Sequence, residues 1–395
     1  MQHATPLIST IVGGIVLAFI LGAIANKFKL PPLIGYLCAG IVVGPHTPGY
    51  TADQALAPEL AELGVILLMF GVGLHFSIKD LMAVKKIAIP GAIVQIGIAT
   101  ALGMLVAWGF DWHWGQGLVY GLALSVASTV VLLRALQERD LIESPQGRIA
   151  VGWLIVEDLA MVLTLVLLPA MAGLLGGGEG AEAAKPATMD VLIEIFATLG
   201  KVIAFVAVML VVGRRFIPWM LERIVWTGSR ELFRLGVLAT ALGAFFAGMV
   251  LAESEFSHRA AEESLPLRDA FAVLFFVSVG MLFDPMVLVN DPWGVLATLL
   301  IIVVGKSVAA LGIVRVFGHN NRIGLTIAVS LAQIGEFSFI LASLGVYLKI
   351  LPERGQALIL AGALLSILLN PVLFHLLDRY TARVDGEGQG DPQPA

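Results

Sequence analysis

Long apolar stretches alternate with short polar connectors along almost the whole chain. A helix that crosses a bilayer needs about 20 mostly apolar residues. Twelve candidate stretches lie at about 6–25, 31–45, 57–76, 87–109, 115–136, 149–175, 190–213, 230–252, 266–284, 292–317, 323–345 and 355–378. This pattern predicts an all-α polytopic membrane protein.

The composition agrees with this class. Hydrophobic residues make up 58% of the chain and charged residues 13%, as expected for a helical membrane protein. The formal net charge is only -5 and the basic residues are scattered through short connectors, which argues against a nucleic-acid partner. The single cysteine, Cys38, excludes an internal disulfide and a thiolate metal site.

The lysines and arginines indicate the topology. Up to the eighth stretch they fall mainly in every second connector, and cytoplasmic loops carry the positive excess, so the N-terminus is expected outside. After the eighth stretch this alternation fails, and one more crossing near Thr240 would restore it. We therefore expect that this sequence lacks one helix near 238–244 and that an intact chain has thirteen spans. The alternative is that the charge bias simply fails here.

Two adjacent carboxylates, Glu157 and Asp158, lie in the middle of the stretch at 149–175. A charge at the bilayer centre costs at least about 2.5 kcal/mol, so such a group faces the protein interior or a wet cavity, or takes up a proton. Both outcomes indicate that the pair handles ions or protons. Because adjacent helical residues are about 100° apart, one carboxylate can contact a neighbouring helix while the other faces a cavity.

Two further stretches carry polar residues at mid-span. The first contains Ser125, Ser128 and Thr129, and the second contains Gln333 and Glu336 beside a glycine. Hydroxyls of this kind more often bond back to the preceding helical turn. Corresponding interruptions in two halves of a chain, however, indicate discontinuous helices and an inverted-repeat transporter. Glu336 could coordinate the ion along its path, or it could hold the interrupted helix together.

Two lysines lie inside predicted spans. Lys306 would be paired with one of the two central carboxylates, and Glu157 is favoured as its partner because Asp158 then stays free to exchange ions. The alternatives are that Lys306 extends to a helix end, or that Lys201 takes the same role.

Two segments are predicted to be loops rather than spans. Gly176–Asp190 is expected to be a flexible external linker, and residues 385–395 a disordered polar tail after a transmembrane domain at 1–384.

Over nearly the whole chain the sequence resembles the monovalent cation:proton antiporter-2 family. Within that family it is similar to the Kef-type potassium/proton exchangers. The matching segments are Pro31–Tyr36 with Gly40 and Gly44–Pro45, Leu67–Leu74, Ser128–Arg134, Val156–Asp158, Leu242–Gly248, Leu274–Met281 and Gln333–Phe337. The resemblance implies a homodimer with crossed discontinuous helices and an elevator motion. It also implies that Asp158 is the ion-exchanging carboxylate, that Thr129 lies near the crossover, and that Lys306 faces the carboxylate pair.

The chain departs from the family pattern in three places. Family members have an extra helix before Leu242, which agrees with the crossing that the charges require. Kef-type members also carry a C-terminal nucleotide-binding regulatory domain, and none follows Arg383 here, so we expect no cofactor in this chain and a regulatory nucleotide only with such a domain. Glu157 stands where relatives have an amide or a second aspartate, which leaves the stoichiometry open.

The leading hypothesis is a secondary active transporter in a bacterial inner membrane that exchanges a monovalent cation, K⁺ rather than Na⁺, for H⁺. Asp158 would bind the proton and the cation alternately, with Glu157, Thr129 and Ser128 around it. No covalent chemistry is required, so no enzymatic activity is expected. The first alternative is a gated monovalent cation channel, but no filter-like sequence is present. A symporter of a small organic solute would need more aromatic and polar lining at mid-span.

Overall fold

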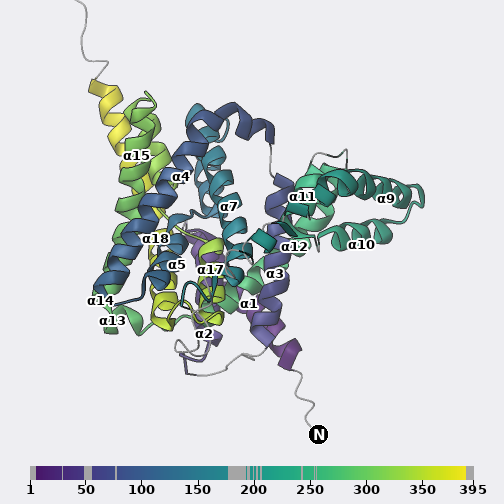
Figure 1. Ribbon diagram of the computed structural model, residues 1–395, viewed down its shortest axis with the longest axis horizontal. Helices are drawn as coiled ribbons and strands as arrows, with labels where there is room; N and C mark the ends of the chain where they lie inside the picture. Colours follow the sequence, from purple (N-terminus) through teal and green to yellow (C-terminus); the bar gives the residue numbers. More distant parts are fainter. Residues whose placement is uncertain are drawn as a thin grey trace, which may run out of the picture. The chain divides into compact units, whose positions relative to one another are not determined.

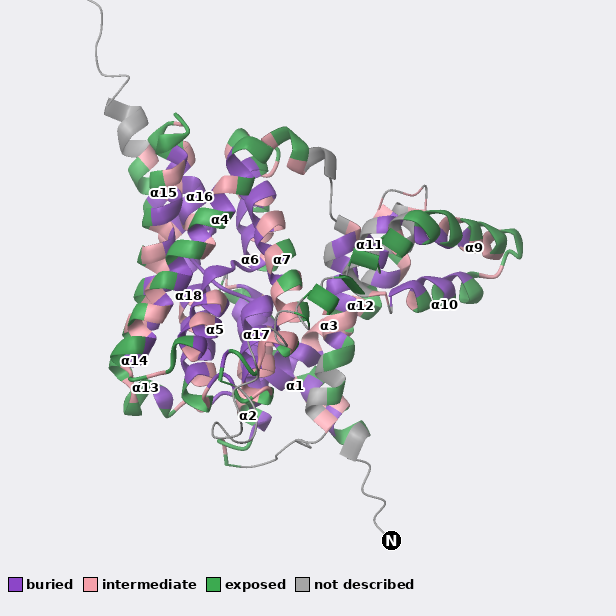
Figure 2. Ribbon diagram, in the orientation of Figure 1, coloured by how far each residue is buried: buried purple, intermediate pink, exposed green. Residues whose placement is uncertain are grey.

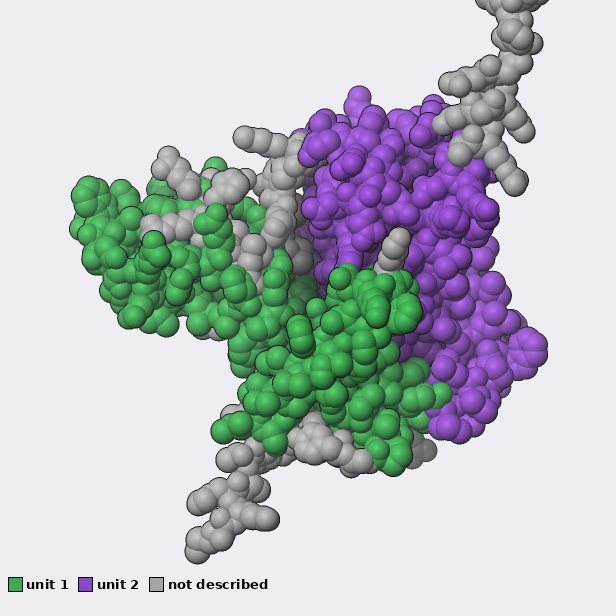
Figure 3. Space-filling view, turned by 180° about the vertical axis from the view of Figure 1, so that it is seen from behind, with its two compact units in different colours: residues 1–78, 193–285 green, residues 79–192, 286–395 purple. Residues whose placement is uncertain are grey.

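The computed structural model describes residues 6–28, 30–48, 56–75, 78–176, 193, 196–198, 200–201, 203–204, 207–241, 243–252, 254 and 256–387. All regular secondary structure in these residues is helical (Figure 1). The chain divides into two compact units, which Figure 3 colours separately: residues 1–78 with 193–285, and residues 79–192 with 286–395. Each unit therefore joins two distant stretches of the sequence.

The first unit contains four helices that pack closely against one another: α1 (Pro6–Lys27), α2 (Pro32–Val43), α3 (Leu56–His75) and α12 (Ser257–Met281). α12 packs along α3, α2 and α1. The main chains of α12 and α2 are in contact at Gly280 and Gly40. A Cβ added to Gly40 would lie only 2.0 Å from the carbonyl oxygen of Val277 in α12. Only glycine permits this approach of two helices.

The same unit contains four further elements: a π-helix η1 (Met209–Gly213), α9 (Arg214–Trp226), α10 (Arg230–Ala241) and α11 (Ala244–Ala252). Their core includes the buried side chains of Leu221, Phe233 and Leu251. α10 ends and α11 begins within the segment where the sequence indicates two different helices, 238–244. The proposed missing helix would belong at this junction.

The second unit is built on long helices: α4 (Ile78–Gly109), α7 (Pro145–Met171), α14 (Pro292–Leu300) continued by a π-helix η2 (Ile301–Gly305) and α15 (Lys306–Val316), and α18 (Glu353–Glu387). Ser144 caps the start of α7 by accepting from the Gly147 N–H, with Pro145 in the first turn. A short helix, α13 (Val287–Asn290), precedes α14. Trp153 of α7 is fully buried in the core of this unit.

Two apolar segments of this unit are interrupted. The first forms α5 (Trp114–Ser125) and α6 (Thr129–Gln137), with extended main chain at Val126 and Ser128 between them. The second forms α16 (Asn321–Ser330) and α17 (Glu336–Tyr347), with a non-helical segment at 331–335. The two predicted discontinuous helices are therefore present, and the non-helical residues of both breaks, 126–128 and 331–335, are buried (Figure 2).

The predicted count of twelve spans is not confirmed by the described residues. Six described helical stretches are long and apolar enough to cross a membrane: Ile8–Lys27, Leu81–Gly109, Trp114–Gln137, Pro145–Met171, Pro292–Val316 and Glu353–Thr381. Others are shorter, such as the 12-residue α2, because Pro31 and Gly44 bound it. α12 begins at Ser257, inside a predicted connector, and α18 reaches Glu387, inside the predicted tail. The linker after Gly176 and residues 388–395 lie outside the described residues.

Candidate functional site

The two helix breaks bind each other directly. The Ser128 N–H donates to Gln333 Oε1 at 2.9 Å, and Gln333 Nε2 donates to the Ser128 carbonyl oxygen at 3.1 Å. A Cβ at Gly335 would lie 2.3 Å from the Cβ of Ser128, so the glycine beside Gln333 permits this close approach. Two segments 205 residues apart in sequence thus form one polar centre in the second unit.

Glu157 connects this centre to two helices. Its side chain is fully buried, and both carboxylate oxygens accept hydrogen bonds. Gln95 Nε2 of α4 donates to Oε1 at 2.7 Å, and the Ala127 N–H in the first break donates to Oε2 at 3.0 Å. Glu157 therefore satisfies a main-chain donor that the interrupted helix leaves free.

Asp158 has a different environment, although it is the next residue along α7. It is 3% exposed, and its Oδ2 accepts from Thr129 Oγ1 at 3.1 Å. Its Oδ1 is buried and has no hydrogen-bond partner among the described residues. A buried carboxylate oxygen without a donor is costly unless it takes up a proton or coordinates a cation.

Glu336 is the third buried carboxylate, at the start of α17. Its Oε2 accepts from Ser128 Oγ at 3.1 Å, and its Oε1 has no partner in the part of the chain that the structure describes. The charge of Glu336 also acts electrostatically on Asp158. These contacts are compatible with a structural role and with a role in the ion path. One oxygen of Glu336 links the two interrupted helices, and the other is available for an ion.

Lys306 does not form the predicted ion pair with Glu157. Its fully buried ammonium donates to the carbonyl oxygen of Gln333 at 3.0 Å, and no ion pair of Lys306 occurs among the described residues. The ammonium instead satisfies a main-chain carbonyl in the second break, while the oxygens of Glu157 accept from Gln95 and Ala127. The two charges nevertheless act on each other electrostatically. Lys201 is exposed, so it does not share this environment.

The broken end of α16 receives donors from several helices. Ser307 Oγ donates to the Ala328 carbonyl at 3.2 Å, and Asn370 Nδ2 of α18 donates to the Val329 carbonyl at 3.0 Å. Gln333 Nε2 also lies 3.3 Å from the Ser330 carbonyl. The last carbonyls of a helix have no intrahelical donors, and a nearby cation is favourable there. Lys306 and these side chains therefore stabilise the break.

The charges at this centre do not balance. Glu157, Asp158, Glu336 and Lys306 are each at most 3% exposed, and one ammonium cannot compensate three carboxylates. Buried charge has to be neutralised by protons or by bound cations. The described residues contain no group of three or more His, Cys, Asp or Glu that could hold a metal ion. Protons or monovalent cations at Asp158 and Glu336, which each have a buried oxygen without a partner among the described residues, would balance the remaining charge.

Three residues of this centre were not predicted as site residues: Gln95, Ser307 and Asn370. Gln95 is the only polar side chain between Lys86 and Thr100, which is a signal that the sequence offered. Asn370 precedes Pro371, and an amide beside a proline in a long apolar stretch is equally typical of a helix kink. Ser307 follows Lys306 directly, and nothing in the sequence shows that it donates to another helix.

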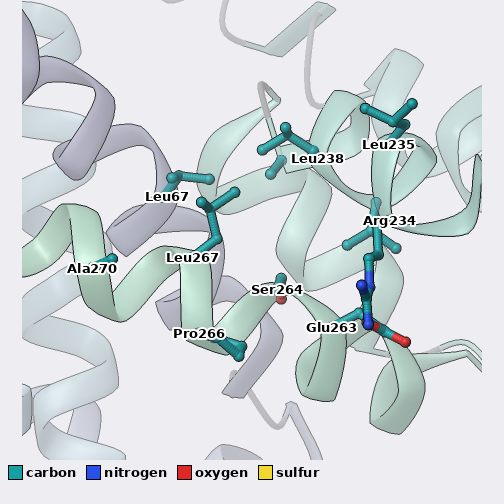
Figure 4. Close-up of a pocket in the computed structure, with 11 residues that line it drawn as sticks. Leu67, Arg234, Leu235, Leu238, Glu263, Ser264, Pro266, Leu267 and Ala270 are labelled. Atoms are coloured by element: carbon teal, nitrogen blue, oxygen red, sulfur yellow. The ribbon is translucent and has the colours of Figure 1, made fainter. Parts of the chain in front are cut away.

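A separate cavity of about 510 Å³ lies in the first unit between α3, α10 and α12 (Figure 4). Its lining is mostly apolar, with Leu67, Leu238 and Leu267 among it. The charged residues in its lining, Arg234 and Glu263, form an ion pair at 2.5 Å. This cavity therefore offers no uncompensated charge to an ion.

Comparison with known proteins gives consistent matches. Residues 15–377 match the family model described as sodium/hydrogen exchanger, transmembrane. The Escherichia coli (strain K12) protein named "Putative cation/proton antiporter YbaL" is 64% identical over 401 residues, which cover 98% of this chain and 71% of that protein. K(+) efflux antiporter 4 of Arabidopsis thaliana is 33% identical over 364 residues, which cover 88% of this chain and 60% of that protein.

Among solved structures, the chain has the fold of a sodium proton antiporter. The matching structure is the sodium proton antiporter MjNhaP1 from Methanocaldococcus jannaschii at pH 8, with a TM-score of 0.65. The match covers 94% of this chain and 97% of that chain at 17% sequence identity.

Proposed function

The chain belongs to the sodium/hydrogen exchanger family, and from this premise we propose that it is a secondary antiporter that exchanges a monovalent cation for H⁺ across a membrane. The observation that carries the proposal is the buried Oδ1 of Asp158, which has no partner among the described residues. This oxygen can hold a proton or a cation, but not both at once. Mutual exclusion at one site couples the two fluxes, because each ion binds only after the other leaves.

Thr129 and Ser128 each position one carboxylate of this site. The Thr129 hydroxyl donates to Asp158 and the Ser128 hydroxyl donates to Glu336, both at 3.1 Å. These contacts leave one oxygen of each carboxylate unoccupied in the described structure. Asp158 is the exchanging group in this proposal, and Glu157 is a structural tie because both of its oxygens accept hydrogen bonds.

K⁺ is the proposed cation. Relatives that are 33%, 31% and 30% identical are named K(+) efflux antiporters 4, 5 and 6, and this supports K⁺ over Na⁺. The sodium antiporter of the structural match shares the fold at only 17% identity, so its cation does not carry over. A gated channel is less well supported, since the relatives named above are antiporters.

We further propose an elevator mechanism in a homodimer in the bacterial inner membrane, with the N-terminus outside. The division into two units supports the elevator, because every residue of the polar centre belongs to the second unit. A rigid unit of this kind could carry the ion while the first unit stays in place. The N-terminal orientation rests on the distribution of lysines and arginines.

The absent helix near 238–244 also remains a proposal. The alignment with YbaL runs over 401 residues, more than the 395 of this chain, so that relative has residues without a counterpart here. The main chain between Ala241 and Ala244 is the junction at which such a helix would be inserted.

Proton flux in proteoliposomes tests the function. The purified chain is reconstituted with an internal pH dye, an outward K⁺ or Na⁺ gradient and a clamped membrane potential. We expect proton uptake that requires the cation gradient and disappears in Asp158→Asn, which keeps the shape of the side chain but removes its charge. The matched control is Glu143→Gln, because the Glu143 side chain is 84% exposed.

Two results would contradict antiport. Exchange that persists in Asp158→Asn would show that another group carries the proton. Cation flux without proton movement would identify a channel instead.

A further inference from the structure

α9 carries a mixed basic and aromatic face that the ion site does not use. Its buried residues, Ile217 and Leu221, pack into the core of the first unit. Four exposed residues follow at spacings of four, four and three along the helix: Arg215, Trp219, Arg223 and Trp226. At 100° per residue these positions fall within one side of the helix, opposite the buried residues.

This face continues an apolar surface of the preceding segment. Val208, Val211 and Val212 are 55%, 63% and 54% exposed, and they come directly before α9. In a membrane protein, exposed valines of this kind contact lipid acyl chains. The change from valine to arginine and tryptophan along one helix is typical of the passage from the hydrocarbon to the headgroup region.

The arginines on this face are available for a ligand. Arg215 and Arg223 form no ion pair with the carboxylates that the structure describes, and the Arg223 guanidinium lies 5.7 Å from the centre of the Trp219 ring. Glu222 is the one acidic residue of α9, so the helix keeps a positive balance. Trp219 and Trp226, at 52% and 81% exposure, have the amphipathic rings that favour the membrane interface.

We propose that the face formed by Arg215, Trp219, Arg223 and Trp226 binds the headgroup of an anionic phospholipid. The two guanidinium groups would provide bidentate donors to the phosphate, and the indole rings beside them would pack against the rest of the headgroup. An acidic protein segment would match the arginines but would not explain why the face continues a lipid-facing row of valines. The site is independent of the proposed ion exchange, since none of its residues belongs to the polar centre.

Lipid retention tests the site. The protein is purified in detergent with phosphatidylglycerol or phosphatidylcholine, and bound lipid is counted by native mass spectrometry at low and high salt. Each interfacial arginine strengthens binding to anionic lipid about five-fold, so Arg215→Gln with Arg223→Gln should weaken phosphatidylglycerol binding about 25-fold at low salt. Phosphatidylcholine binding should not change.

Matched controls separate this site from general electrostatics. Lys85→Gln with Lys86→Gln removes the same charge from another exposed segment, at the start of α4, and should retain lipid binding. Brominated phosphatidylglycerol should quench tryptophan fluorescence in the wild type more than brominated phosphatidylcholine, and the difference should disappear in Trp219→Phe with Trp226→Phe.

Three results would overturn the proposal. Equal retention of both lipids by the wild type would exclude an anionic site. An equal loss in the lysine control would assign the effect to net charge. A change from dimer to monomer in the arginine variant, with lipid retention unchanged, would assign the face to a second copy of the chain.

Discussion

The ammonium of Lys306 donates to the main-chain carbonyl of Gln333 at 3.0 Å and not to a carboxylate. The lysine thus compensates the broken end of a helix and, through space, the charge of Glu157. This arrangement makes the lysine important for stability even though it forms no ion pair with described residues.

Replacing Lys306 by methionine should therefore destabilise the protein. The variant keeps the volume but leaves buried negative charge without compensation, and we expect a loss of about 3 kcal/mol or more in the free energy of unfolding. Chemical denaturation in detergent micelles measures this loss. Exchange should also shift to higher pH, because the carboxylates lose a positive charge that favours their ionised forms. An unchanged pH profile would argue against coupling between Lys306 and the carboxylates.

Gln95 should be required to hold Glu157 in place. Gln95→Leu removes the donor to Glu157 Oε1 and leaves a buried oxygen unsatisfied, at a cost of about 1 to 3 kcal/mol. Denaturation measures the cost, and Gln95→Glu, which adds a carboxylate instead of a donor, should be less stable at pH 8 than at pH 5. Equal stability of wild type and Gln95→Leu would show that this hydrogen bond contributes nothing.

Asn370 should affect exchange although it lies outside the carboxylate group. Asn370→Leu removes the donor to the Val329 carbonyl at the end of α16, and we expect slower exchange together with a stability loss of about 1 kcal/mol. Ser366→Ala is the matched control, because Ser366 is equally buried in α18 but bonds only within its own helix, to Ala363. If both variants exchange ions at the wild-type rate, α18 does not position the break.

The ion pair of Asp291 with Arg354 should make stability depend on pH. The hydrogen bond from Arg354, at 2.7 Å, holds the pKa of Asp291 below its usual value, assisted by the Gly294 N–H and opposed by partial burial. A lowered folded-state pKa stabilises the protein above the unfolded pKa of about 3.9, and this contribution is lost as the pH falls through the folded value.

Thermal unfolding of the wild type and Asp291→Asn measures this contribution. The melting temperature of the wild type should exceed that of the variant at pH 7, and the difference should shrink toward pH 3. The effect should be small, because the pair is partly exposed. A difference in melting temperature that stays constant over this pH range would show that the ionisation of Asp291 does not cause it.

The sequence was sufficient for the main features of the centre. Charged residues inside apolar stretches are rare, so Glu157, Asp158 and Lys306 could be identified without a structure. The interruptions were visible as polar residues beside Gly335 and as the hydroxyls of Ser128 and Thr129. Both breaks are observed at these positions.

The partners of these residues could not be predicted in the same way. Carbonyl acceptors leave no trace in a sequence, so the contact of Lys306 with the Gln333 main chain was not foreseeable. Gln95 and Asn370 are amides within long apolar helices, and their partners lie 62 and 41 residues away. Some helix ends were also misjudged, because hydropathy does not show where a helix continues into polar residues: α12 begins at Ser257 and α18 reaches Glu387, outside the predicted 266–284 and 355–378.

The π-helix η2 ends directly before Lys306. A π-turn is an α-helix with one additional residue, and one residue corresponds to about 100° of rotation. The wider π-turn accommodates this additional residue, so the α-helical turns on either side keep nearly the phase of an uninterrupted α-helix. Deleting Val304 would therefore restore ordinary helical geometry and leave Lys306 directed at Gln333, whereas deleting a residue of the α-helical turns in α14 would rotate Lys306 by about 100°. Insertions and deletions here are a different kind of change from any substitution.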